Sequence, residues 1–439
     1  MTPGPHAGEP RRDGAGRLVV RIARDILMVA GAAGFAQLLA FAAAPAMTRL
    51  FAPDDFGRFA LFGAGVTIIY PLVTLRYEWA LPLPEDEQSA LDLFGLCIAL
   101  AAGFTALLAA LVWFIGPLLS GWIGLRMAEV WLLPLAVGTF SLNGIATNWL
   151  GRQRAFGTLA RVRFASAAGM VAAQLFLGWL LSGGPIGLML GFVAGQVAGM
   201  LTAAGFLGSA LARSLERLSV TRLRRIAGEY RSFAAITAPS NVINALGSQL
   251  PNLAFPALYG AGVAGQYALA QRVLAQPTVL VGNACNQVFW GNAPRLLADD
   301  PMRLRSLFLG LGGALFVAML PTFALIWLGA DMFAFVFGAA WHQAGVFAGL
   351  LVVSSAFQLA AQGTTSLHVY RLNHWMGGWE LLQLALVAGA LAAAAGAHLS
   401  PTGCVAALSL ALVASNAALF ALNAVALRRA GALRNATSA

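Results

Sequence analysis

Gly57-Arg58-Phe59-Ala60-Leu61-Phe62 returns 208 positions later as Gly265-Gln266-Tyr267-Ala268-Leu269-Ala270. Each copy follows a short turn-like loop and opens a long apolar run. Self-similarity at a fixed spacing indicates a duplicated architecture, and two related halves of several helices are a plan typical of membrane transporters. The repeat therefore predicts two equivalent halves, which the rest of the chain must support.

The composition is that of a membrane protein. The chain of 439 residues is 59% hydrophobic and 10% charged, with a mean hydropathy of +0.76, whereas soluble domains carry about 25% charged residues. Its apolar runs are long enough to cross a bilayer. We expect an all-α fold of twelve spans, at 26–48, 58–76, 91–115, 131–150, 162–182, 185–210, 232–258, 264–289, 306–329, 342–369, 377–398 and 402–427.

The expected organisation is two six-helix lobes. The first lobe covers 26–210 and the second covers 232–427, joined by a basic connector at 211–231 and flanked by tails at 1–25 and 428–439. A basic start and Ala42-Ala43-Ala44 resemble a cleaved signal peptide. The first apolar run is longer than the usual ~7–15 residues, so we expect a retained first helix.

Charge placement predicts the orientation. All 27 basic residues are arginines, and the net charge is +10. With both termini in the cytoplasm, 23 arginines fall on the cytoplasmic side, three (Arg49, Arg58 and Arg126) fall outside, and Arg272 falls within a span. This imbalance is the positive-inside signal rather than a nucleic-acid surface. We expect a multi-pass protein of the bacterial cytoplasmic (inner) membrane that can contact anionic head groups through the connector.

Neither the cysteines nor the histidines suggest a metal, a cofactor or catalysis. Cys97, Cys285 and Cys404 all lie in apolar stretches without metal-ligand spacing, and we interpret them as small core residues. The five histidines are scattered, and the predicted outer connections are short. No cofactor, no metal and no enzymatic activity are expected.

A second similarity between the two halves supports the duplication. The fourth predicted span ends at Arg152 and the tenth ends at Arg371, so both place an arginine at the cytoplasmic exit. Arg152 follows Gly57 by 95 residues, whereas Arg371 follows Gly265 by 106 residues, so the duplication requires insertions or deletions. Because six is even, the halves share one orientation and are related by an axis along the membrane normal.

Polar residues form stripes on three spans of the second half, at the spacing of one helix face. Such side chains either hydrogen-bond between helices or line a wet cavity, because facing lipid is costly. Three stripes on neighbouring spans favour a shared cavity. The candidate cavity residues are Asn241, Asn244, Ser248, Arg272, Gln276, Asn283, Gln287, Gln358 and Gln362, with Ser355 and Thr365 on the same stripe as the last two.

Arg272 is the most informative of these candidates. It lies about eight residues into its predicted span, roughly 12 Å deep at 1.5 Å per residue, where an arginine costs about 3 kcal/mol on insertion scales. Snorkelling and an internal ion pair are the alternatives to a cavity role. We expect no carboxylate deep in the membrane, so a cavity with Arg272 suits an anion, and guanidinium pairs bidentately with phosphate.

The stretch 47–93 resembles a known family. The residues that carry the resemblance are Met47 to Gly57, then Leu75-Arg76-Tyr77-Glu78-Trp79-Ala80, Leu83-Pro84-Glu85-Asp86 and Ala90-Leu91, together with Phe337-Gly338, Trp341 and Ala344-Gly345. They are similar to the polysaccharide biosynthesis (O-antigen flippase-like) family of the multidrug/oligosaccharidyl-lipid/polysaccharide (MOP) exporter superfamily. The resemblance implies a MATE-like fold and a flippase for polyprenyl-diphosphate-linked oligosaccharide that works by alternating access in O-antigen or exopolysaccharide biosynthesis.

The resemblance also gives roles to residues. Arg272 would contact a diphosphate or an acidic sugar, and the Asn and Gln stripes would bind sugar hydroxyls. Arg76 and Glu78 match the family pattern and would form a cytoplasmic gate or substrate-entry contact, or else a structural ion pair. Polysaccharide polymerase or assembly proteins are possible partners. The alternatives are a cation-coupled drug antiporter of the same superfamily, a membrane enzyme of polysaccharide assembly, and a non-transporting member of an assembly complex.

Overall fold

The computed structural model describes residues 31, 34–35, 37–216, 219–276, 281–282, 285, 301–363 and 373–437, and within these ranges all regular structure is helical. The fold class predicted from the sequence is therefore confirmed. The long helices are α3 (Pro53–Val73), α4 (Glu87–Ile123), α5 (Met127–Arg152), α6 (Phe156–Leu180), α7 (Pro185–Leu215), α9 (Ala238–Tyr259), α11 (Pro301–Ala318), α12 (Leu325–Phe337), α13 (His342–Gly363), α14 (Asn373–Gly396) and α15 (Pro401–Thr437). Short α2 (Ala44–Leu50) precedes them, and α8 (Val220–Glu229) lies within the connector.

Nine helical segments in the described ranges are long and apolar enough to cross a membrane, so this is a multi-pass membrane protein. They match nine of the twelve predicted spans. Of the other three, the span at 26–48 lies partly outside the described residues, and so does the span at 264–289, of which 261–276 is helical. The remaining span corresponds to α9, which carries three asparagines and three prolines and is less apolar than the nine.

Several helix limits follow from local capping chemistry that hydropathy does not report. Asp86 is the N-cap of α4 and accepts a hydrogen bond from the Ser89 amide (2.7 Å), so α4 begins at Glu87 rather than at 91. The prediction that the second span runs from 58 to 76 is wrong at both ends. α3 begins at Pro53, because proline is favoured in the first turn of a helix. It ends at Val73, and the backbone of Leu75 and Arg76 that follows is left-handed, with φ of 51° and 61°.

The ninth predicted span, 306–329, is broken rather than continuous. It consists of α11, a 3₁₀ segment at Leu320–Ala324, and α12. Pro321 lies in the 3₁₀ segment, where its missing N–H and its ring prevent the α-helical pattern from continuing. Periodicity of apolar residues is the same on both sides of this break, which explains why the sequence suggested a single helix.

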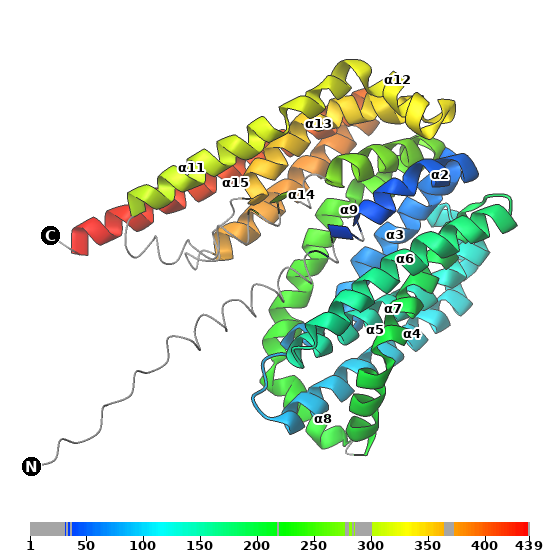
Figure 1. Cartoon of the computed structure of the whole chain (residues 1–439), viewed down its shortest axis with the longest axis vertical. Helices are drawn as coiled ribbons and strands as arrows, with labels where there is room; N and C mark the ends of the chain where they lie inside the picture. The colour runs from blue at the N-terminus through cyan, green and yellow to red at the C-terminus, as the bar shows by residue number, and fades with distance from the viewer. Residues whose placement is uncertain are drawn as a thin grey trace, which may run out of the picture.

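The helices form two groups that meet on one side and diverge on the other (Figure 1). We call the helices from α2 to α7 the first lobe and those from α9 to α15 the second lobe. The lobes meet where α2 and α3 approach α9 and α12, and they diverge toward α8 and α11. We call the side with the start of α3 the Gly57 end and the opposite side the Arg76 end.

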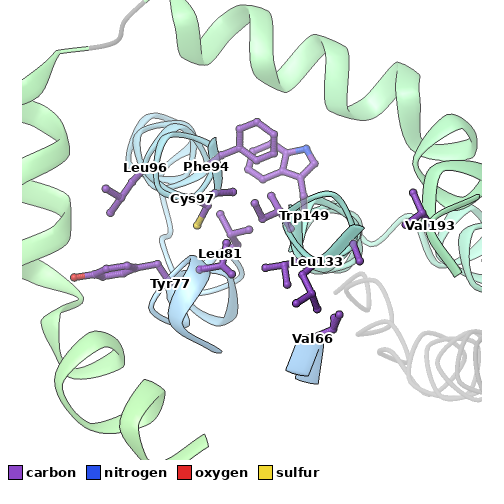
Figure 2. Close-up of a cluster of buried hydrophobic side chains, with 14 of the residues drawn as sticks. Val66, Tyr77, Leu81, Phe94, Leu96, Cys97, Leu133, Trp149 and Val193 are labelled. Atoms are coloured by element: carbon purple, nitrogen blue, oxygen red, sulfur yellow. The ribbon is translucent and has the colours of Figure 1, made fainter. Parts of the chain in front are cut away.

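The first lobe has its own apolar core, built from α3, α4, α5 and α7 (Figure 2). Phe94 of α4 packs on Trp149 of α5 with ring centroids 5.0 Å apart, and Cys97 lies fully buried in the same cluster. Cys404 is fully buried in the core of the second lobe. The prediction that these two cysteines are small core residues is confirmed.

α9 packs on both lobes and has an irregular start. It contacts α3 of the first lobe and α14 of the second. A π-helical turn at Phe233–Thr237 precedes it, and Pro251 and Pro256 lie inside it. Both features remove regular i→i−4 hydrogen bonds, and helices bend at such positions.

Candidate functional site

A cavity of about 490 Å³ lies between the two lobes. It is lined by α3, α5 and α7 from the first lobe and by α9, the helix at 261–276, α13 and α15 from the second. The cavity therefore belongs to neither lobe alone, and a change in the angle between the lobes changes its shape.

The wall from the second lobe is polar. It presents four hydroxyls, four amides and one guanidinium, on Tyr267, Ser248, Ser354, Ser355, Gln249, Asn252, Gln271, Gln358 and Arg272. Asn252 donates to Gln249 Oε1 (3.0 Å) and to Gln271 Oε1 (3.5 Å), while its own Oδ1 is buried without a partner in the described structure. This wall can form many hydrogen bonds with a polar ligand.

The wall from the first lobe is mainly aromatic. Five phenylalanines line it, namely Phe56, Phe59, Phe62, Phe140 and Phe192. Phe192 packs against Phe62 and Phe140, with centroid distances of 6.5 and 5.8 Å. Rings that are locked by one another present a firm apolar surface opposite the polar wall.

Arg272 is the single charged residue among the described lining residues, and none of them is a carboxylate. Its helix begins at residue 261, so it lies about 16 Å along the helix at 1.5 Å per residue, deeper than predicted. None of the ion pairs in the described ranges involves Arg272, and none of the hydrogen bonds there uses its guanidinium. Its five donors are available to a ligand.

The cavity shows the sequence repeat in three dimensions. Six lining positions of the helix at 261–276 have counterparts 208 residues earlier in α3, and all six counterparts also line the cavity. The pairs are Phe59 with Tyr267, Ala60 with Ala268, Gly63 with Gln271, Ala64 with Arg272, Val66 with Leu274, and Thr67 with Ala275. The two copies face each other across the cavity, and among these six pairs only the second copy carries a charge, on Arg272.

The repeated glycines touch each other at the Gly57 end. A Cβ on Gly57 would lie 1.8 Å from the Ala261 carbonyl oxygen, and a Cβ on Gly265 would lie 1.8 Å from that of Pro53. Backbone therefore crosses backbone at a separation that only glycine permits. Trp341 Nε1 donates to the Thr48 carbonyl (3.1 Å) and its ring packs on Phe56 (4.9 Å), which joins the lobes at the same end.

The residues beside these glycines repeat a contact as well. Arg58 pairs with Glu129 near the start of α5 (3.0 Å), and Gln266 accepts a hydrogen bond from the Ala344 amide near the start of α13 (2.9 Å). Glu129 is fully buried. Each copy thus holds the start of a helix in its own lobe, by an ion pair in the first copy and by neutral hydrogen bonding in the second.

Arg76 and Glu78 form a buried cluster at the opposite end. Arg76 Nη1 lies 3.2 Å from Glu78 Oε1, and its Nη2 donates to Asn241 Oδ1 of α9 (2.9 Å). The guanidinium also lies over the rings of Tyr70 and Trp79, 4.6 Å from each centroid. Arg76 thereby ties the end of α3 to α9, in a left-handed backbone conformation that costs about 1–2 kcal/mol.

We expect Arg76→Met to lower stability strongly, because Glu78 would remain fully buried without its cationic partner. Removing one member of a buried pair typically costs about 3–5 kcal/mol, measured here as a lower unfolding midpoint in detergent. The double variant Arg76→Met/Glu78→Met should recover at least half of that loss. An unchanged midpoint for Arg76→Met would rule out the structural role of the pair.

The structure brings some of the predicted site residues together and separates others. Arg272, Ser248, Ser355 and Gln358 line the cavity. Gln276 lies one turn beyond Arg272 and donates to its carbonyl (3.4 Å). Asn241 and Asn244 lie toward the Arg76 end, where Asn244 donates to Glu380 Oε1 of α14 (3.3 Å); Gln362 is also outside the lining. Asn283, Gln287, Thr365 and Arg371 lie outside the described residues.

Besides Tyr267, five polar lining residues were missed, namely Thr67, Gln249, Asn252, Gln271 and Ser354. One of them could have been found, because Asn252 continues the predicted Asn241, Asn244, Ser248 stripe by one more turn. The others adjoin predicted residues or lie in the first half, where single polar residues in apolar helices form no stripe.

Comparison with known proteins gives a family and a fold. A family model described as "polysaccharide biosynthesis protein" matches residues 46–345. Among solved structures, the chain is similar to the lipid II flippase MurJ in an inward closed conformation, with a TM-score of 0.67, 13% identity, and coverage of 90% of this chain and 86% of that one. No curated protein matches significantly.

Two solved structures described as conformations of a multidrug resistance MATE family transporter of the MOP superfamily share the fold as well. An inward-facing conformation has a TM-score of 0.60 at 14% identity, with coverage of 95% of this chain and 99% of that one. An outward-facing conformation has a TM-score of 0.51 at 14% identity, with coverage of 94% and 96%. The closer agreement is with the inward-facing arrangement.

Proposed function

This chain belongs to the polysaccharide biosynthesis protein family and has the fold of MOP-superfamily transporters, and from that premise we propose that it flips a polyprenyl-diphosphate-linked oligosaccharide across the bacterial inner membrane. The observation that carries the proposal is Arg272, a guanidinium without a partner among the described residues, in a cavity between two lobes whose described lining has no carboxylate. The product would feed O-antigen or exopolysaccharide assembly, together with polymerase and assembly proteins.

The chemistry of the two walls suits such a head group. Guanidinium binds phosphate oxygens bidentately, and the neighbouring amides and hydroxyls match the alternating donors and acceptors of sugar hydroxyls. The phenylalanine wall can stack on the apolar faces of sugar rings. The volume of about 490 Å³ is within the usual range for small-molecule sites, so the polar head would enter while the prenyl tail stays in lipid.

Alternating access fits the contacts at the two ends. We propose that the Arg76 end faces the cytoplasm, because Arg152, Arg213 and Arg225 contact residues 81–92 at that end, and that both termini are cytoplasmic. The glycine crossing then closes the outer side, in keeping with the higher TM-score of the inward-facing MATE structure than of the outward-facing one. The lobes would span 26–210 and 232–427 and rock about the cavity, with 211–231 as the cytoplasmic connector.

A reconstituted assay tests the proposal. Proteoliposomes would carry a polyprenyl-diphosphate-linked oligosaccharide with a labelled sugar, and a membrane-impermeant glycosidase would report its arrival in the outer leaflet. We expect conversion at least ten-fold faster than in protein-free vesicles. Added polyprenyl diphosphate should compete, whereas polyprenol, which lacks the phosphates, should not.

The same vesicles separate the alternatives. Proton- or sodium-driven movement of a cationic dye, without flipping, would assign the protein to drug antiport and overturn the proposal. Absence of both activities in correctly folded protein would assign it a non-transporting role in an assembly complex.

A further inference from the structure

A second pocket with polar side chains opens on the surface of the first lobe, separate from the cavity between the lobes. It has a volume of about 340 Å³ and is lined by Gln37, Asn143 of α5, Arg163, Ser166 and Ala167 of α6, and Gln196 of α7. It shares none of its described lining residues with the central cavity. Phe140 and Phe192, one turn away from Asn143 and Gln196, line the central cavity instead.

The hydrogen bonds of this pocket leave an excess of donors. The Asn143 amide nitrogen donates to Ser166 Oγ (3.0 Å) and to Gln196 Oε1 (2.9 Å), which uses those two acceptors. Asn143 and Gln196 are each 8% exposed. Neither Gln196 Nε2 nor the Arg163 guanidinium has a hydrogen-bond or ion-pair partner within the described ranges. The Ser166 O–H also has no acceptor within the described ranges, so the pocket is complementary to anionic oxygen.

Arg163 and its neighbour Arg161 are both exposed on α6, but they differ in their contacts. Arg161 is occupied locally, donating to the Gly157 carbonyl (3.4 Å) and to Thr158 Oγ1 (3.4 Å). Arg163 lies seven residues into α6, about 10 Å along the helix, and lines the pocket. A guanidinium at this depth without a counter-ion is costly in a membrane, and a bound anion would remove that cost.

The surroundings of the pocket favour a ligand with an apolar tail. Phe35 and Phe164 flank it on the outer surface of the lobe, with rings 5.7 Å apart and exposed fractions of 55% and 44%. We propose that the Arg163 pocket binds the phosphate group of an amphipathic lipid, whose hydrocarbon chain lies along these rings. The site is independent of the transported substrate and of the central cavity.

Native mass spectrometry of the purified protein in detergent tests this site. The probes are phosphatidic acid, diacylglycerol with the same tails, and inorganic phosphate. We expect an adduct with phosphatidic acid that diacylglycerol does not form. Arg163→Gln should weaken it at least ten-fold, whereas the matched control Arg161→Gln should change it less than two-fold.

Ala167→Leu provides a variant that keeps the charge but fills the pocket, and it should also weaken the adduct at least ten-fold with an unchanged unfolding midpoint. Equal losses for Arg161→Gln and Arg163→Gln, or full binding by Ala167→Leu, would assign the adduct to general surface charge and overturn the proposal. Displacement of the lipid by an equal concentration of inorganic phosphate would overturn its lipid part.

Discussion

Arg272→Ala is expected to abolish flipping while protein level and fold are retained. The guanidinium provides the one cationic group among the described residues of the central cavity, and a bidentate phosphate contact that is lost from a water-poor site costs at least about 3 kcal/mol. That corresponds to a fall of more than 100-fold in transport rate. The measurement is the vesicle assay, supported by complementation of surface polysaccharide in cells that lack the gene.

Three variants make this prediction sharp. Arg272→Lys keeps the charge but loses the planar fork, and we expect partial activity. Arg272→Gln keeps hydrogen bonding without charge and should resemble Arg272→Ala. Arg213→Ala serves as the matched control, because it removes an arginine from a half-exposed ion pair with Glu87 (3.0 Å). Such a surface pair contributes little to stability. Full transport by Arg272→Ala would contradict the anion-cavity interpretation.

Gly57→Val is expected to prevent the lobes from closing at the Gly57 end. Even the first carbon of a side chain would lie 1.8 Å from the Ala261 carbonyl oxygen, and Gly265→Val would place one equally close to that of Pro53. Overpacking of this kind costs typically 1–3 kcal/mol and more against backbone, which shifts the equilibrium toward outward-open states by about 100-fold. Transport should fall to background, because alternating access needs both states.

Distances between spin labels on α2 and α12 would report the change, and they should lengthen in both variants. Gly65→Ala is the control on the same helix, because its Cβ would lie 3.6 Å from Leu133 Cδ2, an ordinary contact. It should transport at the wild-type rate. Wild-type distances in Gly57→Val would show that the glycine crossing does not govern closure.

Hydropathy and repetition in the sequence were sufficient for the helical class, most spans and the two-copy plan. The repeat was the strongest signal, because Gly57 and Gly265 are constrained by the same crossing and each helix then continues along the same cavity. Arg272 was also identifiable, since a charge in an apolar run needs a reason. These features are local in sequence or obey a fixed spacing.

What the sequence did not reveal depends on the packing between distant segments. Asn241 and Asn244 share a stripe with Ser248, yet they bond to Arg76 and Glu380 and lie outside the cavity. One turn of this helix therefore hydrogen-bonds to neighbouring elements, whereas the turn with Ser248 lines the cavity. The phenylalanine wall could not be predicted, because Phe140 and Phe192 have the same apolar character as their lipid-facing neighbours.

α9 is held by both lobes within a single helical turn. Asn241 accepts from Arg76 on the first lobe and Asn244 donates to Glu380 on the second, three residues further on. A straight, rigid helix with contacts to two moving lobes would either resist their motion or lose one of the two contacts. The π-turn before these two contacts and the prolines after them make α9 easier to bend on both sides. α9 can therefore bend when the lobes move apart and straighten when they close, while it keeps its contacts with both lobes.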